Sequence, residues 1–431
     1  MSEALSRETL DYIEINDEFK QALDVIENTN DSVFVTGRAG CGKSTLLRYL
    51  KANTKKNAVV LAPTGVAAIN VMGQTIHSFF KFPPKFIDKR VIRKMRNREI
   101  FKNIELIIID EVSMVRADLM DGIDHALRIN RGFDIPFGGA QVVMFGDLFQ
   151  LPPVIRGDEM KAFFQQHYGS AYFFNAAVFL ELNLHYIELH KIYRQSDKKF
   201  IDLLDRVRSK DVNQQDIELL NQRFISLPKQ LAHIITLTTT NKIAAQVNEY
   251  HLNKLNSNEY QFEAEISEQF DESFFPTEYN LKLKKGAQVM MIMNDPQQRW
   301  VNGTIAEIEE LDHDLIKVRI ENQVHEVKRT TWHKIEYKFD KENKHILEDI
   351  TGTFMQYPLR LAWAITIHKS QGKTFDNVII DLGYGAFAHG QVYVALSRCV
   401  SFEGIILKRP IRADDIIFDQ KVYEFRKNFG H

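Results

Sequence analysis

Eight consecutive residues, Gly37–Ser44, restrict the possible folds of this chain more than any other feature. They read GRAGCGKS, which matches the pattern G-x-x-x-x-G-K-[ST]. The apolar run Ser32–Thr36 predicts a buried strand before them, and the spacing of Thr45–Leu50 predicts a helix after them. Glycines here let backbone N–H groups converge on phosphate oxygens, and the helix start adds positive potential. The sequence therefore predicts a phosphate-binding loop between a strand and a helix.

Three further apolar runs have the same character as the strand before this loop. Each is continuously apolar rather than alternating, and the three are Ala58–Ala62, Leu106–Ile109 and Val142–Phe145. Continuous apolar runs are typical of parallel strands that helices cover on both faces. Because helical patterns lie between these runs, the first half of the chain is predicted to be a doubly wound α/β domain.

Two acids, Asp110 and Glu111, directly follow one of the predicted strands. This places both carboxylates at the carboxyl edge of the sheet, where open α/β folds bind ligands. Lys43 is expected to reach the β and γ phosphates of a nucleotide, and Ser44 and Asp110 are expected to hold Mg²⁺. Glu111 is expected to orient and deprotonate the attacking water. At this level a kinase, a GTPase, an AAA-type motor and a helicase all remain open.

Composition excludes several classes of protein. The chain has 431 residues, enough for two to four domains at roughly 100–200 residues each. Its two cysteines, Cys41 and Cys399, exclude a disulfide framework and a Cys-rich zinc site. No apolar run reaches the ~18–20 residues of a membrane span, and the acidic N-terminus is unlike a signal peptide. We therefore expect no membrane partner and a cytoplasmic protein, bacterial rather than nuclear.

The second half of the chain changes character after about residue 186. Residues 234–239 predict a strand and residues 243–255 an amphipathic helix, whereas 260–350 show short strands separated by turn signals such as Asn302-Gly303. Buried-strand runs resume at Leu361–Ile367 and Val378–Asp381. The predicted division is a first domain at 1–185, a second domain at 186–259 and 351–431, and a small β-barrel insertion at 260–350.

The order of the later motifs discriminates among the P-loop classes. GDLFQLPP occupies residues 146–153, Tyr-Arg-Gln 193–195, AITIHKSQGKT 364–374 and YVALSR 393–398. With Pro63-Thr64-Gly65, these segments resemble motifs of superfamily 1 helicases. Together with GRAGCGKS and DEVSM they more closely resemble the Pif-type (petite integration frequency) helicases and their RecD-like relatives. The resemblance spans about residues 16–400, and six motifs in the right order make it specific.

The resemblance implies that ATP and Mg²⁺ bind between two RecA-like domains. Gln150 would sense the γ-phosphate, and Gln21 would read the adenine. Arg194 and Arg398 would act as arginine fingers, which contribute ~10³–10⁵-fold to phosphoryl transfer in general. The catalytic residues implied are then Lys43, Glu111, Gln150, Arg194 and Arg398. The nucleotide contacts implied are Gln21, Gly37, Ala39, Gly40, Cys41, Gly42, Lys43, Ser44, Thr45, Gln371 and Gly372.

The same resemblance implies a track for single-stranded DNA across both domains. The residues that match DNA-contacting positions are Pro63, Thr64, Gly65, His77, Ser78, Phe79, Asn241, Thr366, His368 and Lys369. Among them, His77 or Phe79 is a candidate for stacking on a base. A small strand-separating insertion is expected at about residues 76–100. The run 81–102 holds nine basic residues against two acids, which fits either a solvated face or a phosphate-facing patch.

The function implied is an ATP-dependent DNA helicase that moves 5′ to 3′ on single-stranded DNA as a monomer. Its substrates would include forked duplexes, G-quadruplexes and RNA–DNA hybrids. A different class remains open: a DNA-stimulated ATPase that remodels protein–DNA complexes without processive unwinding. A purely structural DNA-binding module with a decayed site is disfavoured because every catalytic residue type is present.

Overall fold

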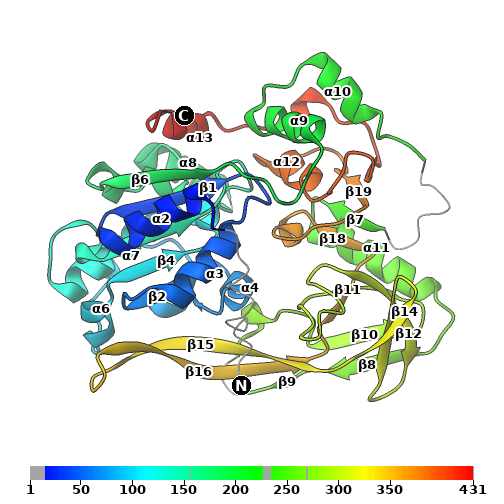
Figure 1. Ribbon diagram of the computed structural model, residues 1–431, viewed down its shortest axis with the longest axis horizontal. Helices are drawn as coiled ribbons and strands as arrows, with labels where there is room; N and C mark the ends of the chain where they lie inside the picture. Colours follow the sequence, from blue (N-terminus) through cyan, green and yellow to red (C-terminus); the bar gives the residue numbers. More distant parts are fainter. Residues whose placement is uncertain (1–14, 156, 227–233, 268–269, 431) are drawn as a thin grey trace.

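A computed structural model describes residues 15–155, 157–226, 234–267 and 270–430 (Figure 1). The first part is a parallel sheet of six strands in the order β3-β2-β4-β5-β1-β6. The strands are β1 (Ser32–Gly37), β2 (Ala58–Ala62), β3 (Gln74–Thr75), β4 (Leu106–Ile109), β5 (Gln141–Phe145) and β6 (Leu184–Leu189). The doubly wound α/β domain predicted from the continuous apolar runs is confirmed.

Helices cover both faces of this sheet, which explains why its strands are apolar throughout. Alternate strand residues such as Val33 and Phe34 belong to two separate apolar clusters, one on each face. One cluster includes α2 and α3, and the other includes α7. The helices of this part are α2 (Asp17–Asn28), α3 (Lys43–Asn53), α4 (Gly65–Asn70), α5 (Ile76–Phe79), α6 (Glu99–Asn103), α7 (Ala117–Arg131) and α8 (Asp158–Tyr168).

The second part is a smaller parallel sheet of four strands in the order β18-β7-β19-β20. Its strands are β7 (Ile235–Thr238), β18 (Ala364–Thr366), β19 (Val378–Asp381) and β20 (Ile405–Leu407). Its helices are α9 (Lys198–Ser209), α10 (Gln214–Asn221), α11 (Asn241–Lys254) and α12 (Gln391–Leu396). Strands from both sides of the insertion share this sheet, so the insertion leaves and returns at one domain.

The predicted boundary between the first two domains at 185/186 falls inside β6. That strand pairs with β1 along its whole length, from Ser32 opposite Leu184 to Gly37 opposite Leu189. The first sheet therefore continues to residue 189. The alternating pattern of LHYIEL made the strand hard to assign, because β6 lies at the edge of the sheet and its first residues are only half-buried.

The insertion, predicted as a small β-barrel, consists of antiparallel sheets. Five strands pair in the order β14-β13-β12-β11-β17, while β10 pairs with β8 and β9 pairs with β16 in separate sheets. Their bounds are β8 (Glu259–Glu263), β9 (Glu265–Ile266), β10 (Asn280–Lys284), β11 (Gln288–Met291), β12 (Ile305–Leu311), β13 (Ile316–Ile320), β14 (Gln323–Val327), β15 (Thr330–Asp340), β16 (His345–Gln356) and β17 (Leu359–Leu361). Because β16 and β17 belong to these sheets, the insertion extends beyond residue 350.

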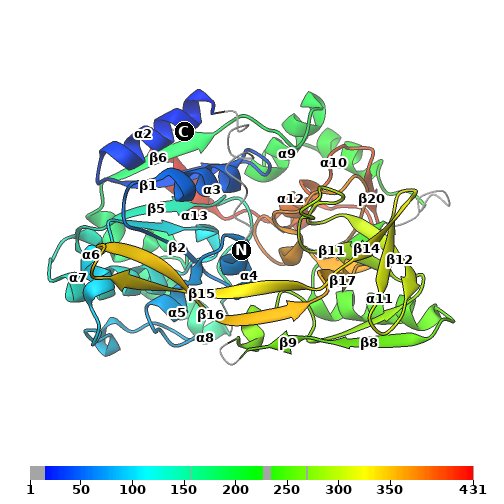
Figure 2. The same cartoon turned by 60° about the horizontal axis from the view of Figure 1, so that its bottom comes forward.

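A long hairpin, β15–β16, reaches from the insertion to the first domain (Figure 2). The Tyr337 hydroxyl accepts a hydrogen bond from the N–H of Val60 on β2 at 3.0 Å. Lys51 of α3 forms an ion pair with Glu348 at 2.7 Å. The hairpin therefore docks on backbone and side chains of the first domain.

The last helix, α13 (Gln420–Lys427), returns from the second domain to the first (Figure 1). Its Phe425 ring stacks on Phe174 with 4.3 Å between centroids, and Arg426 pairs with Glu188 of β6 at 2.9 Å. None of the helices in the described ranges has the length and apolar character needed to span a bilayer.

Candidate functional site

The loop Gly37–Ser44 joins β1 to α3 and has the backbone geometry of a phosphate cradle. Gly40 and Gly42 have φ values of +80° and +90°, a region that favours glycine. The Lys43 ammonium folds back over the loop and donates to the carbonyl oxygens of Gly37 at 2.7 Å and Arg38 at 3.0 Å. These carbonyls hold the positive charge where phosphate oxygens are expected. Ser44 is exposed in the first turn of α3, and Thr45 follows it.

The two predicted acids lie at the end of β4, opposite this loop. Burial raises the pKa of Asp110 to about 6, and burial together with the charge of Asp110 raises the pKa of Glu111 to about 7. The positive charge of Lys43 opposes both shifts. Carboxylate and hydroxyl oxygens are ligands that Mg²⁺ accepts, so the carboxylates of Asp110 and Glu111 and the exposed hydroxyl of Ser44 are a donor set that fits this ion.

Gln150 comes from the turn after β5 and faces the second domain. Its side-chain oxygen accepts a hydrogen bond from the Gln371 amide at 3.2 Å. A methyl group placed on Gly390 would lie 2.6 Å from the Gln150 carbonyl oxygen, so the two domains are in close contact here. Gly372, with φ +75°, lies next to Gln371. The predicted γ-phosphate sensor is therefore bonded to a predicted nucleotide contact of the facing domain.

Both predicted arginine fingers lie at the junction of the first and second domains, which we call the crevice. Arg194 lies in the linker between β6 and α9, and a methyl group on Gly40 would come 2.5 Å from its Cβ. Its guanidinium donates to the Ser397 carbonyl at 3.2 Å. Arg398 is fully buried, and its Nε donates to the Val394 carbonyl at 2.9 Å.

Neither arginine forms an ion pair within the described part of the chain, which is unusual for buried guanidinium groups. Burial and the neighbouring charge of Arg194 lower the pKa of Arg398 to about 9, while Glu111 and Asp147 oppose this shift. Two arginines without ion-pair partners thus lie near acids whose pKa values burial raises. An arrangement of this kind is suited to a bound phosphate–cation pair.

The sequence reasoning missed two residues that connect the domains at the crevice. The Tyr393 hydroxyl accepts from the N–H of Ala39 in the phosphate loop at 3.1 Å and donates to Asp147 at 3.5 Å. Arg208 forms an ion pair with the same Asp147 at 3.2 Å. Tyr393 belongs to the segment YVALSR, so the motif was found but only its arginine was given a role.

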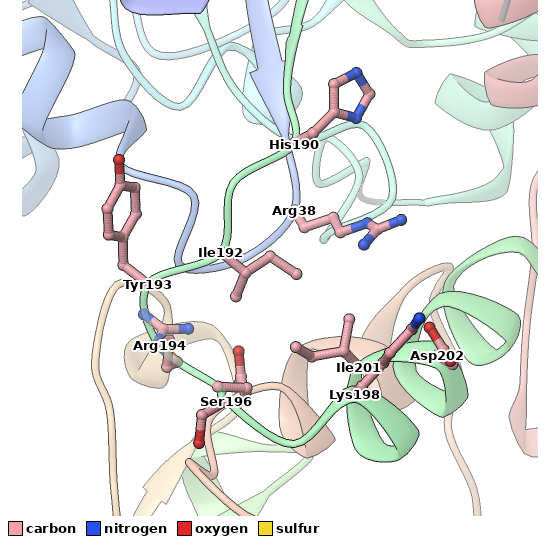
Figure 3. A pocket seen from close by; sticks show the side chains of 10 residues that line it. Arg38, His190, Ile192, Tyr193, Arg194, Ser196, Lys198, Ile201 and Asp202 are labelled. Atoms are coloured by element: carbon pink, nitrogen blue, oxygen red, sulfur yellow. The ribbon is translucent and has the colours of Figure 1, made fainter. Parts of the chain in front are cut away.

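A cavity of about 850 Å³ lies beside the phosphate loop (Figure 3). It is lined by Arg38 of the loop, by the linker residues His190, Ile192, Tyr193, Arg194, Gln195 and Ser196, and by Lys198, Ile201 and Asp202 of α9. Tyr193 is half exposed, and its ring lies within 3.6 Å of a methyl group placed on Gly42. An exposed ring beside a phosphate loop is a candidate for stacking on a nucleotide base. Gln21 is exposed on α2, two residues after Phe19, which also contacts Gly42.

Most predicted DNA contacts lie at the carboxyl ends of strands. Pro63 and Thr64 follow β2, and Thr64 caps α4 by accepting from the N–H of Ala67. Gly65 is buried because Ser273 and Phe274 of the insertion cover it; a methyl group on Gly65 would lie 2.6 Å from the Ser273 carbonyl oxygen.

The second domain contributes the remaining predicted DNA contacts. Asn241 is exposed at the start of α11, directly after β7. Thr366 ends β18, and its hydroxyl accepts from the N–H of Lys369 at 3.3 Å. Burial lowers the pKa of His368, which is half-buried beside them. These four residues lie along one edge of the second sheet.

The predicted stacking role of Phe79 is not supported. Its ring is only 6% exposed and lies in an apolar cluster 4.9 Å from Phe80 and 6.2 Å from Tyr337, centroid to centroid. Ser78 is bonded to Gln74 at 3.0 Å, and burial lowers the pKa of the half-buried His77. His77 therefore remains the candidate for base stacking in this segment.

Two RecA-like sheets, a phosphate loop, a carboxylate pair and arginines contributed from beyond the first sheet define a P-loop ATPase of the two-domain motor class. The PIF1-like helicase family model matches residues 14–218. The ATP-dependent DNA helicase Pif1 of Bdellovibrio bacteriovorus is 33% identical over 97% of this chain and 92% of that protein. The chain spans 57–63% of the lengths of its fungal and mouse relatives.

Solved structures agree with the sequence comparisons. A Bacteroides Pif1 in complex with ADP-AlF4 is 38% identical, covers 97% of both chains and superimposes with a TM-score of 0.89. A Bacteroides Pif1 bound to single-stranded DNA has the same identity and coverage but a TM-score of 0.70. The chain belongs to the PIF1-like helicase family.

Proposed function

We propose that this protein is an ATP-dependent DNA helicase that moves 5′ to 3′ along single-stranded DNA and unwinds forked duplexes. We extend the proposal to G-quadruplexes and RNA–DNA hybrids as further substrates. Family membership makes the chain an ATP hydrolase of the helicase class. Relatives described as Pif1 bound to single-stranded DNA and as two coordinating Pif1 helicases at forked double-stranded DNA support the choice of substrate. That it acts as a monomer stays a prediction.

The observation that carries the proposal is a pair of arginines without ion-pair partners at the junction of the two domains: Arg194 packs against Gly40 of the phosphate loop, and the charge of Arg398 acts on Glu111. When ATP binds, Lys43 exchanges its two loop carbonyls for phosphate oxygens. The guanidinium groups then stabilise the charge that develops on the transferred phosphoryl group. Because these arginines lie outside the first domain's strands and helices, turnover depends on how the two domains meet.

Magnesium fits the site through Ser44 and Asp110, and it would supply charge neutralisation between the phosphates and these oxygens. Glu111 holds the proton of the attacking water, and its raised pKa keeps it close to the range in which a general base works. Gln150 meets Gln371 across the crevice, two residues after Lys369 in the DNA-facing segment. This hydrogen bond connects the proposed ATP site to the segment that carries predicted DNA contacts.

Strand displacement on tailed duplexes tests the proposal. The protein should release the strand of a 5′-tailed duplex in an ATP-dependent way and leave a 3′-tailed duplex intact. Unwinding of the 3′-tailed duplex alone would contradict the polarity. ATP turnover stimulated by DNA without strand release would favour the remodelling ATPase instead.

Lys43→Ala should lower ATP turnover by at least about 10³-fold because no other described cation covers the loop carbonyls. The fold should persist, since the Lys43 ammonium contacts only atoms of its own loop. Lys20→Ala is the matched control: Lys20 is exposed on α2 and pairs only with Asp17. Retained turnover in Lys43→Ala would remove the nucleotide site from this loop.

A further inference from the structure

Three cationic side chains lie where the insertion joins the second domain, and the charge of Arg360 acts on the other two. Arg360 pairs with Met290 of β11, and Lys373 packs beside Gly303, whose N–H donates to the carbonyl of Met291 in the same strand. Arg360 lies in the middle of β17, and Lys369 and Lys373 lie in the segment after β18. Leu359 and Leu361 point into the apolar core of the insertion, so the alternation of the strand turns Arg360 to the opposite face. There its Nη2 donates to the carbonyl of Pro276 at 2.5 Å.

The charges of these three side chains are not neutralised. None of them forms an ion pair with any acid in the described ranges, and Glu278 is the only carboxylate whose charge affects Arg360. The Lys373 ammonium donates to the neutral amide oxygen of Asn302 at 2.6 Å. Burial, and then the charge of Arg360, lower the pKa of Lys369, and the charge of Glu278 partly opposes this shift. Burial and the charge of Arg360 also lower the pKa of Lys373 to about 8.

Arg360 and Lys373 are half-buried, whereas Lys369 is exposed at the edge of the cluster. Half-buried cations that repel one another are costly to keep unless an anion joins them. Some cations of the insertion have acids at hand: Lys317 pairs with Glu310 at 2.6 Å, and Arg299 pairs with Asp295 at 2.6 Å. The cluster of Arg360, Lys369 and Lys373 differs from these two pairs because its half-buried members have no such partner among the described residues.

The cluster lies next to predicted DNA contacts of both domains. Lys369 is bonded to Thr366 through its backbone. On the other side, the segment that carries Pro276 begins at Ser273 and Phe274, which cover Gly65 of the first domain. An anion held by the cluster would thus lie between the DNA-facing segments of the two RecA-like domains, beneath the insertion.

We propose that Arg360, Lys369 and Lys373 together bind one backbone phosphate of single-stranded DNA. Lys369 is already a predicted DNA contact, whereas Arg360 and Lys373 are new, and they bring the insertion itself into the binding site. The inference rests on the proposed function. Arginine and lysine donors from two elements suit a phosphodiester, because guanidinium and ammonium groups both hydrogen-bond its charged oxygens and neutralise it.

The test measures the affinity of a fluorescein-labelled oligothymidylate as a function of salt. Lys373→Gln and Arg360→Gln should each weaken binding about tenfold, as expected for the loss of a charge-assisted hydrogen bond. Each should also lower the salt slope, by up to about 0.7 for a single strand that loses one phosphate contact. Lys373→Arg keeps the charge and should keep the slope. Lys317→Gln, a lysine paired with an acid on the same insertion, is the matched control.

A second measurement separates a contact to the backbone from a general loss of charge. In a series of oligothymidylates, each carries one uncharged methylphosphonate linkage, placed at a different position in each. At one position this linkage should lower the affinity of the parent protein but leave the affinity of Lys373→Gln unchanged. Absence of such a position, or an unchanged salt slope in both Gln variants, would overturn the proposal. Inorganic phosphate at matched ionic strength is a further competitor. If it displaces DNA from the parent but not from Lys373→Gln, the cluster binds free phosphate, and the proposal is overturned.

These measurements do not depend on unwinding. If the parent binds oligothymidylate with the position effect but releases no strand from a tailed duplex, the proposed helicase function fails and the phosphate site stands. If the parent unwinds DNA and the position effect is absent, the phosphate site fails and the proposed function stands.

Discussion

The two RecA-like sheets place different chemistry on the same edge. In the first sheet, the carboxyl ends of β1 and β4 carry a phosphate loop and two acids whose pKa values are raised by burial. In the second, the ends of β7 and β18 carry Asn241, Thr366 and the segment that leads to Gln371. The first edge carries acids near Lys43, and Arg398, beside the second edge, has no ion-pair partner among the described residues.

On the proposed assignment of the site, this difference divides the groups of the ATPase between the two domains. The first domain would supply the groups that bind phosphate and activate water, namely Lys43 and the two acids near it. The second part of the molecule supplies guanidinium groups that are satisfied by backbone carbonyls while the charge itself is unpaired. Phosphate chemistry is therefore divided between two bodies, and domain motion can control it.

The largest expected effect is the loss of ATP turnover when Arg398, which the second domain contributes, is replaced. Arg398→Ala should lower ATP turnover by about 10³–10⁵-fold, because it removes a charge that acts mainly on the transition state. Nucleotide affinity should fall much less, and comparison of kcat with a fluorescent nucleotide's Kd measures this. Arg319→Ala, an exposed arginine paired with Glu309, is the control. Equal losses in turnover and affinity would argue against a finger role.

Arg398 is also fully buried, so a folding defect must be separated from a catalytic one. Arg398→Lys keeps a cation but cannot reproduce the planar guanidinium geometry. If both variants unfold at the parent's temperature while turnover is lost, the arginine acts in catalysis. A large drop in unfolding temperature in both would mean that its buried hydrogen bonds dominate.

An intermediate effect is expected where the second domain's last helix meets the first domain. Phe425→Ala should destabilise the protein by about 2–3 kcal/mol, somewhat less than a fully buried phenylalanine, because the ring stacks on Phe174 but is only half-buried. Thermal unfolding measures the loss. Tyr423→Ala on the same helix is the control, since its side chain is 47% exposed. An unchanged unfolding temperature would show that α13 is not part of the first domain's core.

The smallest expected effect concerns the first domain's acids. Because the folded protein raises the pKa of Glu111 from about 4.5 to about 7, the folded state holds a proton that the unfolded state releases in this range. Stability should fall as pH rises from 4.5 to 7, and the cost should persist above pH 7. Glu111→Gln should therefore be more stable than the parent at pH 8, on the order of 1–2 kcal/mol, with a difference that disappears below pH 4.5.

Unfolding temperatures at several pH values, without nucleotide or Mg²⁺, measure this effect. Glu159→Gln is the control because Glu159 is exposed on α8. A parent whose stability relative to Glu111→Gln does not depend on pH would show that the acids are already compensated. Turnover of Glu111→Gln should be lost in any case, since the amide cannot accept the water proton.

The parts of this structure that depend on local signals were predictable from sequence. The strand before GRAGCGKS and the strand before Asp110 are each marked by a short apolar run, and the glycine pattern fixes the turn. Phe79 was not predictable in the same way, because a phenylalanine after a helix start suits a core as well as a stacking surface. Its partners, Phe101 and Tyr337, lie 22 and 258 residues away in the chain.

The domain boundaries differ from the predicted ones for the same reason, because they depend on contacts between residues far apart in the chain. β6 joins the first sheet through pairing with β1, and α13 joins the first domain through Phe174, Phe173 and Phe34, all more than 200 residues away. Unneutralised charge at Arg360 and Lys373 is likewise invisible in sequence, because it depends on which acids the fold leaves out of reach.

The return of α13 to the first domain has a mechanical consequence. Both α2 and α13 pack on that domain, so the polypeptide returns to it at α13 as well as at the hairpin β15–β16. A mechanical force applied through attachment points near these two helices would act on the first domain and not across the crevice between the domains. Force spectroscopy would then measure the mechanical strength of the first domain. Opening of the crevice would have to be followed with a probe placed on the second domain.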